Sequence, residues 1–241
     1  MLVEQSKMEA IKRDLEQRDL TKVTFRGIDF LFGTTITLPG LVQEIFGDCY
    51  RIFDRGMKFG PGDLVLDIGA NEGLFAIMMA KCFPGVRVIA LEPVAGTYGQ
   101  MVRNLKLNDL DESVVKPLCV GVGGTERNLD LVCSKDYSGG STACGTFKPA
   151  DHVLCPVRVV TLDGVLDEYV GGRVALLKMD IEGMEYEALY ASTCLDRVDT
   201  MVAEFHINEK LRAAGRDINE LATWVGARTR LVFYDRVVMC E

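Results

Sequence analysis

Residues 65–73 read VLDIGANEG, an apolar run that ends in a turn containing an aspartate, an asparagine and two glycines. Glycine in such a turn lets the backbone approach a ligand closely, and the helix expected next begins with unpaired N–H groups. The dinucleotide fingerprint needs glycine at its first, third and sixth positions, which are Gly69, Asn71 and Leu74 here. The turn therefore predicts a ligand without a pyrophosphate. The residues expected to hold it are Asp67, Gly69, Asn71 and Gly73.

A carboxylate follows the next apolar run and strengthens this interpretation. Glu92, in the segment ALEP, follows directly after the run 86–91, where a carboxylate can accept hydrogen bonds from a ribose diol. The alternative is that the glycines only make a tight connection, and that Glu92 precedes a proline near a helix start, where negative charge is favoured anyway. The turn follows the first expected strand and Glu92 follows the second. This order is typical of a ribose-binding site at the edge of a parallel sheet, which favours a ribose-containing cofactor.

Short apolar runs alternate with helix-length segments along most of the chain. This pattern is typical of parallel strands joined by helical crossovers. The fold class that it predicts is a doubly wound α/β domain with a mostly parallel, seven-stranded sheet, in which the first and fourth runs are central because they are almost wholly apolar. The expected strands are 64–68, 86–91, 114–120, 174–179, 200–205 and a closing pair near 230–239, and the expected helices are 73–82, 94–107, 183–192 and 218–226.

The N-terminal region differs from the rest. Residues 1–57 are expected to form a helical cap on a main domain that spans 58–241. Its parts would be an N-terminal helix of mixed charge, an alternating strand in TFRGIDFLFG (24–33) and a helix near 41–55. The stretch 134–148 is rich in glycine, serine and threonine and predicts a loop.

Composition restricts the classes of partner. The chain has 241 residues, of which 48 % are apolar and 26 % charged, and no run approaches the roughly 18 apolar residues of a membrane helix. The net charge of −8, without a block of Lys and Arg, argues against nucleic acid and favours a small-molecule partner. Nothing resembles an export signal, and the eight cysteines are scattered, which predicts a cytoplasmic protein with reduced thiols. The N-terminal helix could provide a homodimer contact.

Two further strand ends carry groups suited to catalysis. Asp180 and Glu182 end one expected strand, and Glu204 and His206 end the next. Alternate residues of a strand face the same way, and neighbouring parallel strands end at the same edge of a sheet. His206 is the expected general base because an imidazole ordinarily titrates near neutral pH. Glu204 would orient it or bind the substrate, and Asp180 would help to place the reactants.

Each of these residues also has a simpler interpretation. Glu182 and Glu185 lie in the first turn of an expected helix, where carboxylates are stabilising whatever the function. His206 could be a buried imidazole with a satisfied hydrogen bond. The four residues could also bind a divalent metal, since oxygen ligands with one imidazole suit Mg, Mn or Fe. This spacing is a weak metal signal beside paired Cys/His motifs, so no metal ligand is assigned.

The motifs together resemble the FkbM-type methyltransferases. The resemblance covers about 58–206 and rests on VLDIGANEG, LEP, RNLKLN (103–108), TLDGVL (161–166) and KMDIEGMEYEAL (178–189). It implies a Rossmann-like class I enzyme that uses S-adenosyl-L-methionine, with Asp180 at the edge of the cofactor and Asn104 at a family position that supports the cofactor loop.

The resemblance also implies O-methylation of a hydroxyl on a small natural-product, sugar or lipid-like acceptor. Two alternatives stay open. One is a nicotinamide-dependent oxidoreductase, although no Tyr-x-x-x-Lys pair follows a central strand. The other is a non-catalytic cofactor-binding protein.

Overall fold

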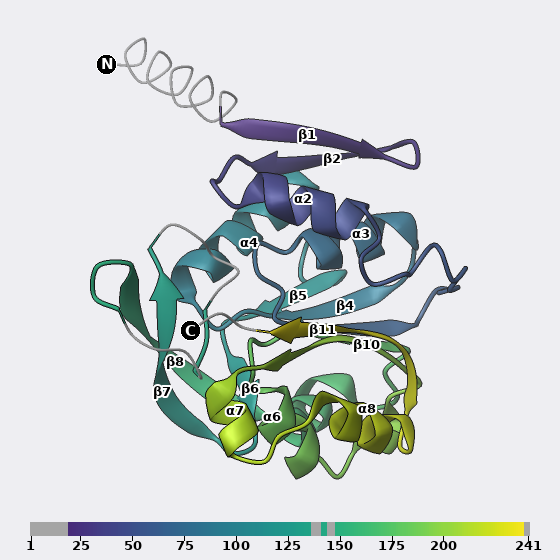
Figure 1. The fold of residues 1–241 in the computed structure, drawn as a ribbon. Helices are drawn as coiled ribbons and strands as arrows, with labels where there is room; N and C mark the ends of the chain where they lie inside the picture. Colours follow the sequence, from purple (N-terminus) through teal and green to yellow (C-terminus); the bar gives the residue numbers. More distant parts are fainter. Residues whose placement is uncertain (1–18, 136–140, 144–147, 239–241) are drawn as a thin grey trace.

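The computed structural model describes residues 19–135, 141–143 and 148–238, so the expected N-terminal helix and part of the expected 134–148 loop lie outside the described residues. The centre of the fold is a sheet in which every adjacent pair of strands is parallel (Figure 1). Across the sheet the strands are β11 (Arg230–Val238), β10 (Thr200–Ile207), β9 (Leu176–Met179), β3 (Leu64–Ile68), β4 (Arg87–Leu91) and β5 (Val115–Leu118). β9 and β3 are central, as predicted.

The sheet has six described strands rather than the expected seven. The closing pair expected near 230–239 is instead the single strand β11, which runs parallel to β10 from Thr200↔Arg230 to Ile207↔Val238. The physical reason is visible in the sequence RLVFYDRVV, which contains no glycine, proline or asparagine to reverse the chain. The prediction of a doubly wound, parallel architecture is confirmed, and only the strand count is corrected.

Helices cover both faces of the sheet because alternate strand residues point in opposite directions. Val65 of β3 packs with α2 (Leu38–Phe46), α3 (Leu74–Cys82) and α4 (Ala95–Leu107). Leu64 and Leu66 pack in a second core on the opposite face. The short elements of that face are α5 (Leu162–Val165), the π-helical turn η2 (Leu166–Val170), α6 (Glu185–Ala191), the 3₁₀ turn η3 (Leu195–Arg197), α7 (Glu209–Ala213) and α8 (Ile218–Gly226).

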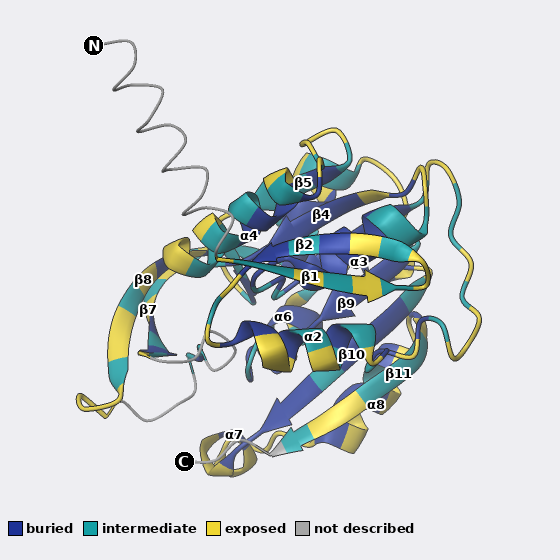
Figure 2. Ribbon diagram, turned by 90° about the horizontal axis from the view of Figure 1, so that it is seen from above, coloured by how far each residue is buried: buried dark blue, intermediate teal, exposed yellow. Residues whose placement is uncertain are grey.

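The N-terminal region adds a layer outside α3 and α4. The expected single strand is a hairpin of β1 (Leu20–Phe25) and β2 (Ile28–Gly33), because Arg26 and Gly27 both have positive φ angles and form a two-residue turn. Helix α2 ends at Phe46 rather than near residue 55, and Asp48 and Arg51, both in the left-handed region, follow it. Figure 2 shows this layer from above, with the hairpin and α2 lying over α3.

A second, smaller sheet was not predicted. It consists of β6 (Gly121–Gly123), β7 (Arg127–Ser134) and β8 (His152–Thr161), in the order β6-β8-β7, and it stands beside the central sheet (Figure 1). Leu131, Val157 and Val159 from its buried face pack against Met184. The sheet therefore extends the core beyond the end of the central strands.

The cysteines and the helices bear on the expected reduced thiols and on the expected absence of a membrane span. The six cysteines within the described residues for which a state is assigned are free thiols. Among the described helices, none combines the length and the apolar composition needed to cross a bilayer.

Candidate active site

A cavity of about 330 Å³ lies at the carboxyl ends of the central strands. Its walls come from the turn after β3, the ends of β9 and β10, helix α2 and the small sheet. Six of the predicted site residues line it: Gly69, Asn71, Glu92, Asp180, Glu204 and His206. The other three, Asp67, Gly73 and Asn104, do not line the cavity, and each is buried or packed behind its wall.

The turn after β3 is held in a conformation that requires its glycines. Gly69 has a φ of +80°, and a Cβ built there would lie 1.8 Å from the carbonyl oxygen of Asp180. Gly73 has a φ of +83°, and its Cβ would lie 2.8 Å from Cγ of Met101. Asn71, between them, is also left-handed at φ 51°. Gly69 therefore allows the end of β3 to touch the end of β9, and Gly73 allows the turn to lie close against α4.

Glu92 presents its carboxylate to the cavity from a buried position. Its Oε2 accepts a hydrogen bond from the N–H of Asn71 at 3.1 Å, and its Oε1 accepts one from the N–H of Val94 at 2.9 Å. Burial raises the pKa of Glu92 to about 7, against the lowering effect of these two N–H groups. Each carboxylate oxygen has further lone pairs, so the group can still accept hydrogen bonds from a ligand.

Asn104 does not line the cavity but contacts the turn by a hydrogen bond to its backbone. Its side chain is fully buried, its Nδ2 donates to the carbonyl of Glu72 at 2.8 Å, and its Oδ1 accepts from the N–H of Gly33 at 2.9 Å. The carboxylate of Glu72 in turn accepts hydrogen bonds from the hydroxyls of Thr35 and Thr37. Asn104 can therefore affect a ligand only through the shape of the turn and its link to β2.

Lys178 is a central residue of the site to which the sequence analysis gave no role. Its Nζ donates to the carbonyl oxygen of Gly69 at 2.6 Å, and it lies 3.4 Å from Oδ1 of Asp67 and 3.7 Å from Oδ2 of Asp180. Burial opposes its charge, yet the carboxylates of Asp67 and Asp180 hold its pKa above the usual value. The sequence signal for this role was a lysine within the apolar run VALLKM, because a buried charge needs polar or charged partners nearby.

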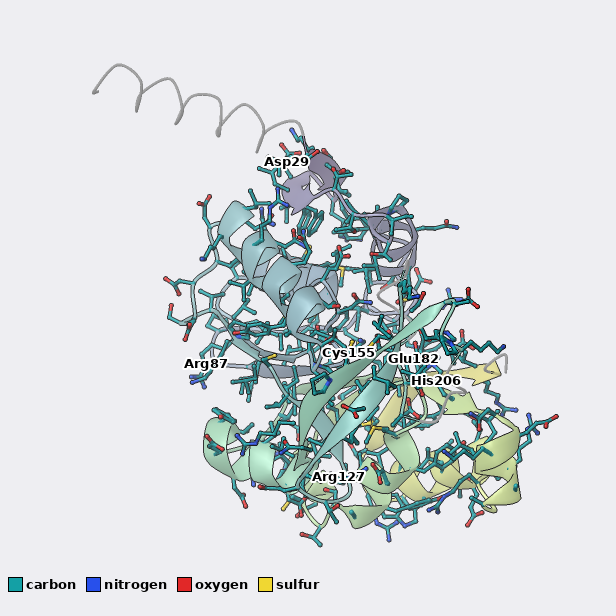
Figure 3. The ribbon with its side chains drawn as sticks, turned by 90° about the vertical axis from the view of Figure 1, so that its left-hand side faces the viewer. Asp29, Arg87, Arg127, Cys155, Glu182 and His206 are labelled. Atoms are coloured by element: carbon teal, nitrogen blue, oxygen red, sulfur yellow. The ribbon has the colours of Figure 1, made fainter. Side chains whose placement is uncertain are left out.

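Three carboxylates surround His206 at the other end of the cavity. Its Nδ1 donates to Oε1 of Glu185 at 2.8 Å, while its Nε2 lies 3.5 Å from Oε2 of Glu182 and 3.8 Å from Oδ1 of Asp180. Figure 3 shows Glu182 and His206 side by side. Glu185, rather than Glu204, is thus the residue that orients the imidazole.

The charge of His206 differs from the expectation. Burial opposes protonation, but the carboxylates of Glu185, Glu182 and Asp180 together raise the pKa of His206 to about 10. At neutral pH the ring is therefore largely in its imidazolium form, which has no lone pair with which to accept a proton. The raised pKa thus differs from the near-neutral value expected for His206, while its role as the general base stays a prediction.

Glu204 lies apart from the His206 ring and faces helix α2. It forms a group with Glu44 and Cys49, whose side-chain O and S atoms all lie within 4.8 Å of one another. Burial, followed by the negative charges of Asp180 and Glu44, raises the pKa of Glu204 to about 7. The cavity thus has one buried carboxylate at Glu92 and a concentration of carboxylates at the ends of β9 and β10.

Comparison with known proteins identifies the family of the chain. The family model described as "Methyltransferase FkbM domain" matches residues 67–227. Methyltransferase sdnD from Sordaria araneosa is 32 % identical over 177 residues, which are 62 % of this chain and 66 % of that protein. The 31-O-demethyl-FK506 methyltransferase FkbM from Streptomyces tacrolimicus is 29 % identical over 197 residues, covering 69 % of this chain and 74 % of that one.

Among solved structures, the methyltransferase FkbM from Methylobacillus flagellatus KT is 17 % identical with a TM-score of 0.46, and the match covers 75 % of this chain and 41 % of that one. The chain thus spans just under two thirds of sdnD and under half of the solved structure. Since the family model covers well over half of the chain, the protein belongs to the FkbM methyltransferase domain family.

Proposed function

We propose that this protein transfers a methyl group from S-adenosyl-L-methionine to a hydroxyl group of a small acceptor. Membership of the family supports methyl transfer. The choice of cofactor rests on Glu92, a buried carboxylate on the cavity wall that two backbone N–H groups hold in place. Its remaining lone pairs can accept hydrogen bonds from a ribose diol.

The residues present fit this cofactor. Glu92 would bind the ribose, and the backbone of the turn from Gly69 to Glu72 would hold the amino-acid end, since all four turn residues line the cavity. When bound, the cofactor supplies an electrophilic methyl group on a sulfonium. The contribution of the chain is to hold the acceptor in line with that methyl group and to exclude other orientations.

The acceptor would bind between the carboxylates and helix α2. Asp180 and Glu204 line this part of the cavity and can accept hydrogen bonds from hydroxyl groups. Leu41 and Ile45 of α2 provide an apolar wall, which suits an acceptor with an apolar part. A relative whose name specifies O-methylation, the FkbM protein of Streptomyces tacrolimicus, supports a hydroxyl as the methyl acceptor.

Calorimetry of metal-stripped protein with S-adenosyl-L-methionine tests the cofactor, with NADH as the comparison ligand. We expect saturable binding of S-adenosyl-L-methionine and no heat with NADH. The Glu92→Gln variant should bind about 10- to 100-fold more weakly, because it loses hydrogen bonds to a charged acceptor that are together worth about 1.5–3 kcal/mol. Heat with NADH alone would show that the proposed function is wrong.

The same carboxylate predicts a pH dependence of binding. Because the pKa of Glu92 is raised to about 7, the group is largely protonated at pH 6 and ionised at pH 8. Only the ionised form accepts hydrogen bonds at both oxygens, so affinity should rise with pH, by up to roughly tenfold per unit below the pKa. Dissociation constants measured from pH 5.5 to 8.5 would show this. The Glu92→Gln variant is the control, since its affinity should lack this rise.

A further inference from the structure

We propose that Asp180, Glu182 and His206 form a binding site for a divalent cation such as Mn²⁺ or Mg²⁺ at the acceptor end of the cavity. The three side chains come from the ends of the neighbouring strands β9 and β10, and all three line the cavity. The binding itself is independent of the proposed function, whereas the use of the cation in methyl transfer rests on it.

The spacing of the three groups fits a shared ion better than a set of hydrogen bonds. One ligand atom from each residue lies within 4.8 Å of the other two. His206 Nε2 is 3.5 Å from Oε2 of Glu182 and 3.8 Å from Oδ1 of Asp180, whereas good hydrogen bonds of this type are about 2.7–3.2 Å long. Ligand atoms that each lie about 2.0–2.3 Å from one ion are necessarily separated by distances of this order.

The orientation of His206 is the second, independent observation. The side chain is 2 % exposed, and its Nδ1 is fixed by the hydrogen bond to Glu185. Its Nε2 points between Glu182 and Asp180 and makes no hydrogen bond with any residue that the structure describes. Metal-binding histidines almost always donate their other ring N–H to a carboxylate or carbonyl in this way. Glu185 is therefore the positioning residue, and Nε2 is the ligand atom.

The backbone after β9 brings the two carboxylates to the same point. Glu182 is left-handed at φ 55°, and Gly183 follows at φ 101°. This bend turns the chain sharply, so that both Asp180 and Glu182 approach the imidazole across the strand end. The two carboxylates and the imidazole therefore meet at one point beside the strand end, as the ligands of a single cation would.

The ligand types indicate which ions fit. Two carboxylates and one imidazole suit Mg²⁺, Mn²⁺ or Fe²⁺ rather than ions that prefer thiolates. No thiol of the described residues belongs to this group, and Cys49 belongs to the separate group with Glu44 and Glu204. Because Mn²⁺ binds oxygen and imidazole ligands and can be followed by its magnetic resonance signal, it is the appropriate probe.

A cation at this point would also bind the oxygen of an acceptor hydroxyl at the same end of the cavity. An acceptor hydroxyl bound to the ion would have a lowered pKa. Its O–H bond would break with release of the proton to water, its oxygen would form a bond to the methyl carbon, and the carbon–sulfur bond of the cofactor would break with both electrons remaining on sulfur. No side chain then needs to act as the general base.

The test is titration of metal-stripped protein with MnCl₂ in the absence of S-adenosyl-L-methionine, with free Mn²⁺ measured by electron paramagnetic resonance. One saturable site is expected. Glu182→Gln and His206→Gln should each weaken binding by about 10- to 100-fold or more. The matched control is Glu92→Gln, which makes the same carboxylate-to-amide change in the same cavity and should leave Mn²⁺ binding intact.

The outcomes separate this inference from the proposed function. Wild-type Mn²⁺ affinity in both ligand variants, or no saturable site at millimolar Mn²⁺, would overturn the cation site even if S-adenosyl-L-methionine binds normally. Mn²⁺ binding without any S-adenosyl-L-methionine binding would overturn the proposed function and retain the cation site. Thermal unfolding of each variant shows that it is folded, and Asp180→Asn takes the place of either variant that is not.

Discussion

Replacing Gly69 by alanine is expected to remove cofactor binding and to lower the free energy of unfolding by more than about 3 kcal/mol. A Cβ at this position would lie 1.8 Å from the backbone oxygen of Asp180, so no side-chain rotation can relieve the overlap. The φ of +80° adds strain for any residue with a Cβ. Relief would require β3 and β9 to separate at the point where both contribute to the cavity.

Gly99→Ala provides the matched control. Gly99 lies inside helix α4, where an added Cβ would meet nothing within 4 Å. Alanine favours a helix over glycine by roughly 0.5–1 kcal/mol, so this variant should be as stable as the wild type or more so. Urea unfolding and calorimetry with S-adenosyl-L-methionine compare the two. A Gly69→Ala protein with wild-type stability and affinity would show that the two strand ends are not in close contact.

Replacing Lys178 by methionine is expected to lower the free energy of unfolding by about 3–5 kcal/mol at pH 8, the usual cost of leaving a buried charge without its partner. Asp67 is fully buried, and burial already raises its pKa despite the nearby ammonium group. Without Lys178, both Asp67 and the carbonyl of Gly69 lose their contact with the ammonium group. The loss should shrink as the pH falls, because a group with a raised pKa in the folded state destabilises the protein only when ionised.

A second change distinguishes this electrostatic cause from a loss of packing. Asp67→Asn in the Lys178→Met background removes the unpaired charge and should restore part of the stability, which a double-mutant cycle measures. Lys106→Met, on the exposed side of α4, should change the stability by no more than about 0.5 kcal/mol. Additive effects of the Lys178 and Asp67 changes would contradict the proposed pairing.

The sequence predicted the elements that depend on local signals. Strand β3 and helix α8 have the predicted bounds, 64–68 and 218–226. The first is an apolar run interrupted only by Asp67. The second follows the N-cap Asp217, whose side chain accepts a hydrogen bond from the N–H of Glu220. The polar residues at the strand ends were also predictable, because parallel strands end at one edge of a sheet.

The remaining features depend on contacts between distant parts of the chain. Glu185 and His206 are 21 positions apart, and Lys178 and Gly69 are 109 apart. Neither pairing leaves a local pattern, so the sequence could not identify the partner of the imidazole or its raised pKa. The small sheet was missed for a similar reason, because β6 pairs with β8 rather than with β7, and because the connection between the paired strands β7 and β8 is long, from residue 135 to 151.

The hydrogen bonds between the N-terminal layer and the turn after β3 bear on how such proteins can be recombined. Asn104 and Asn108 of the main domain bind the backbone of β2, while Glu72 of the turn binds the threonines that precede α2. The family model begins only at residue 67. A chimera cut at that boundary would exchange the α2 wall of the cavity but separate these hydrogen-bonding partners. A working exchange should therefore transfer Glu72, Asn104 and Asn108 together with the N-terminal layer.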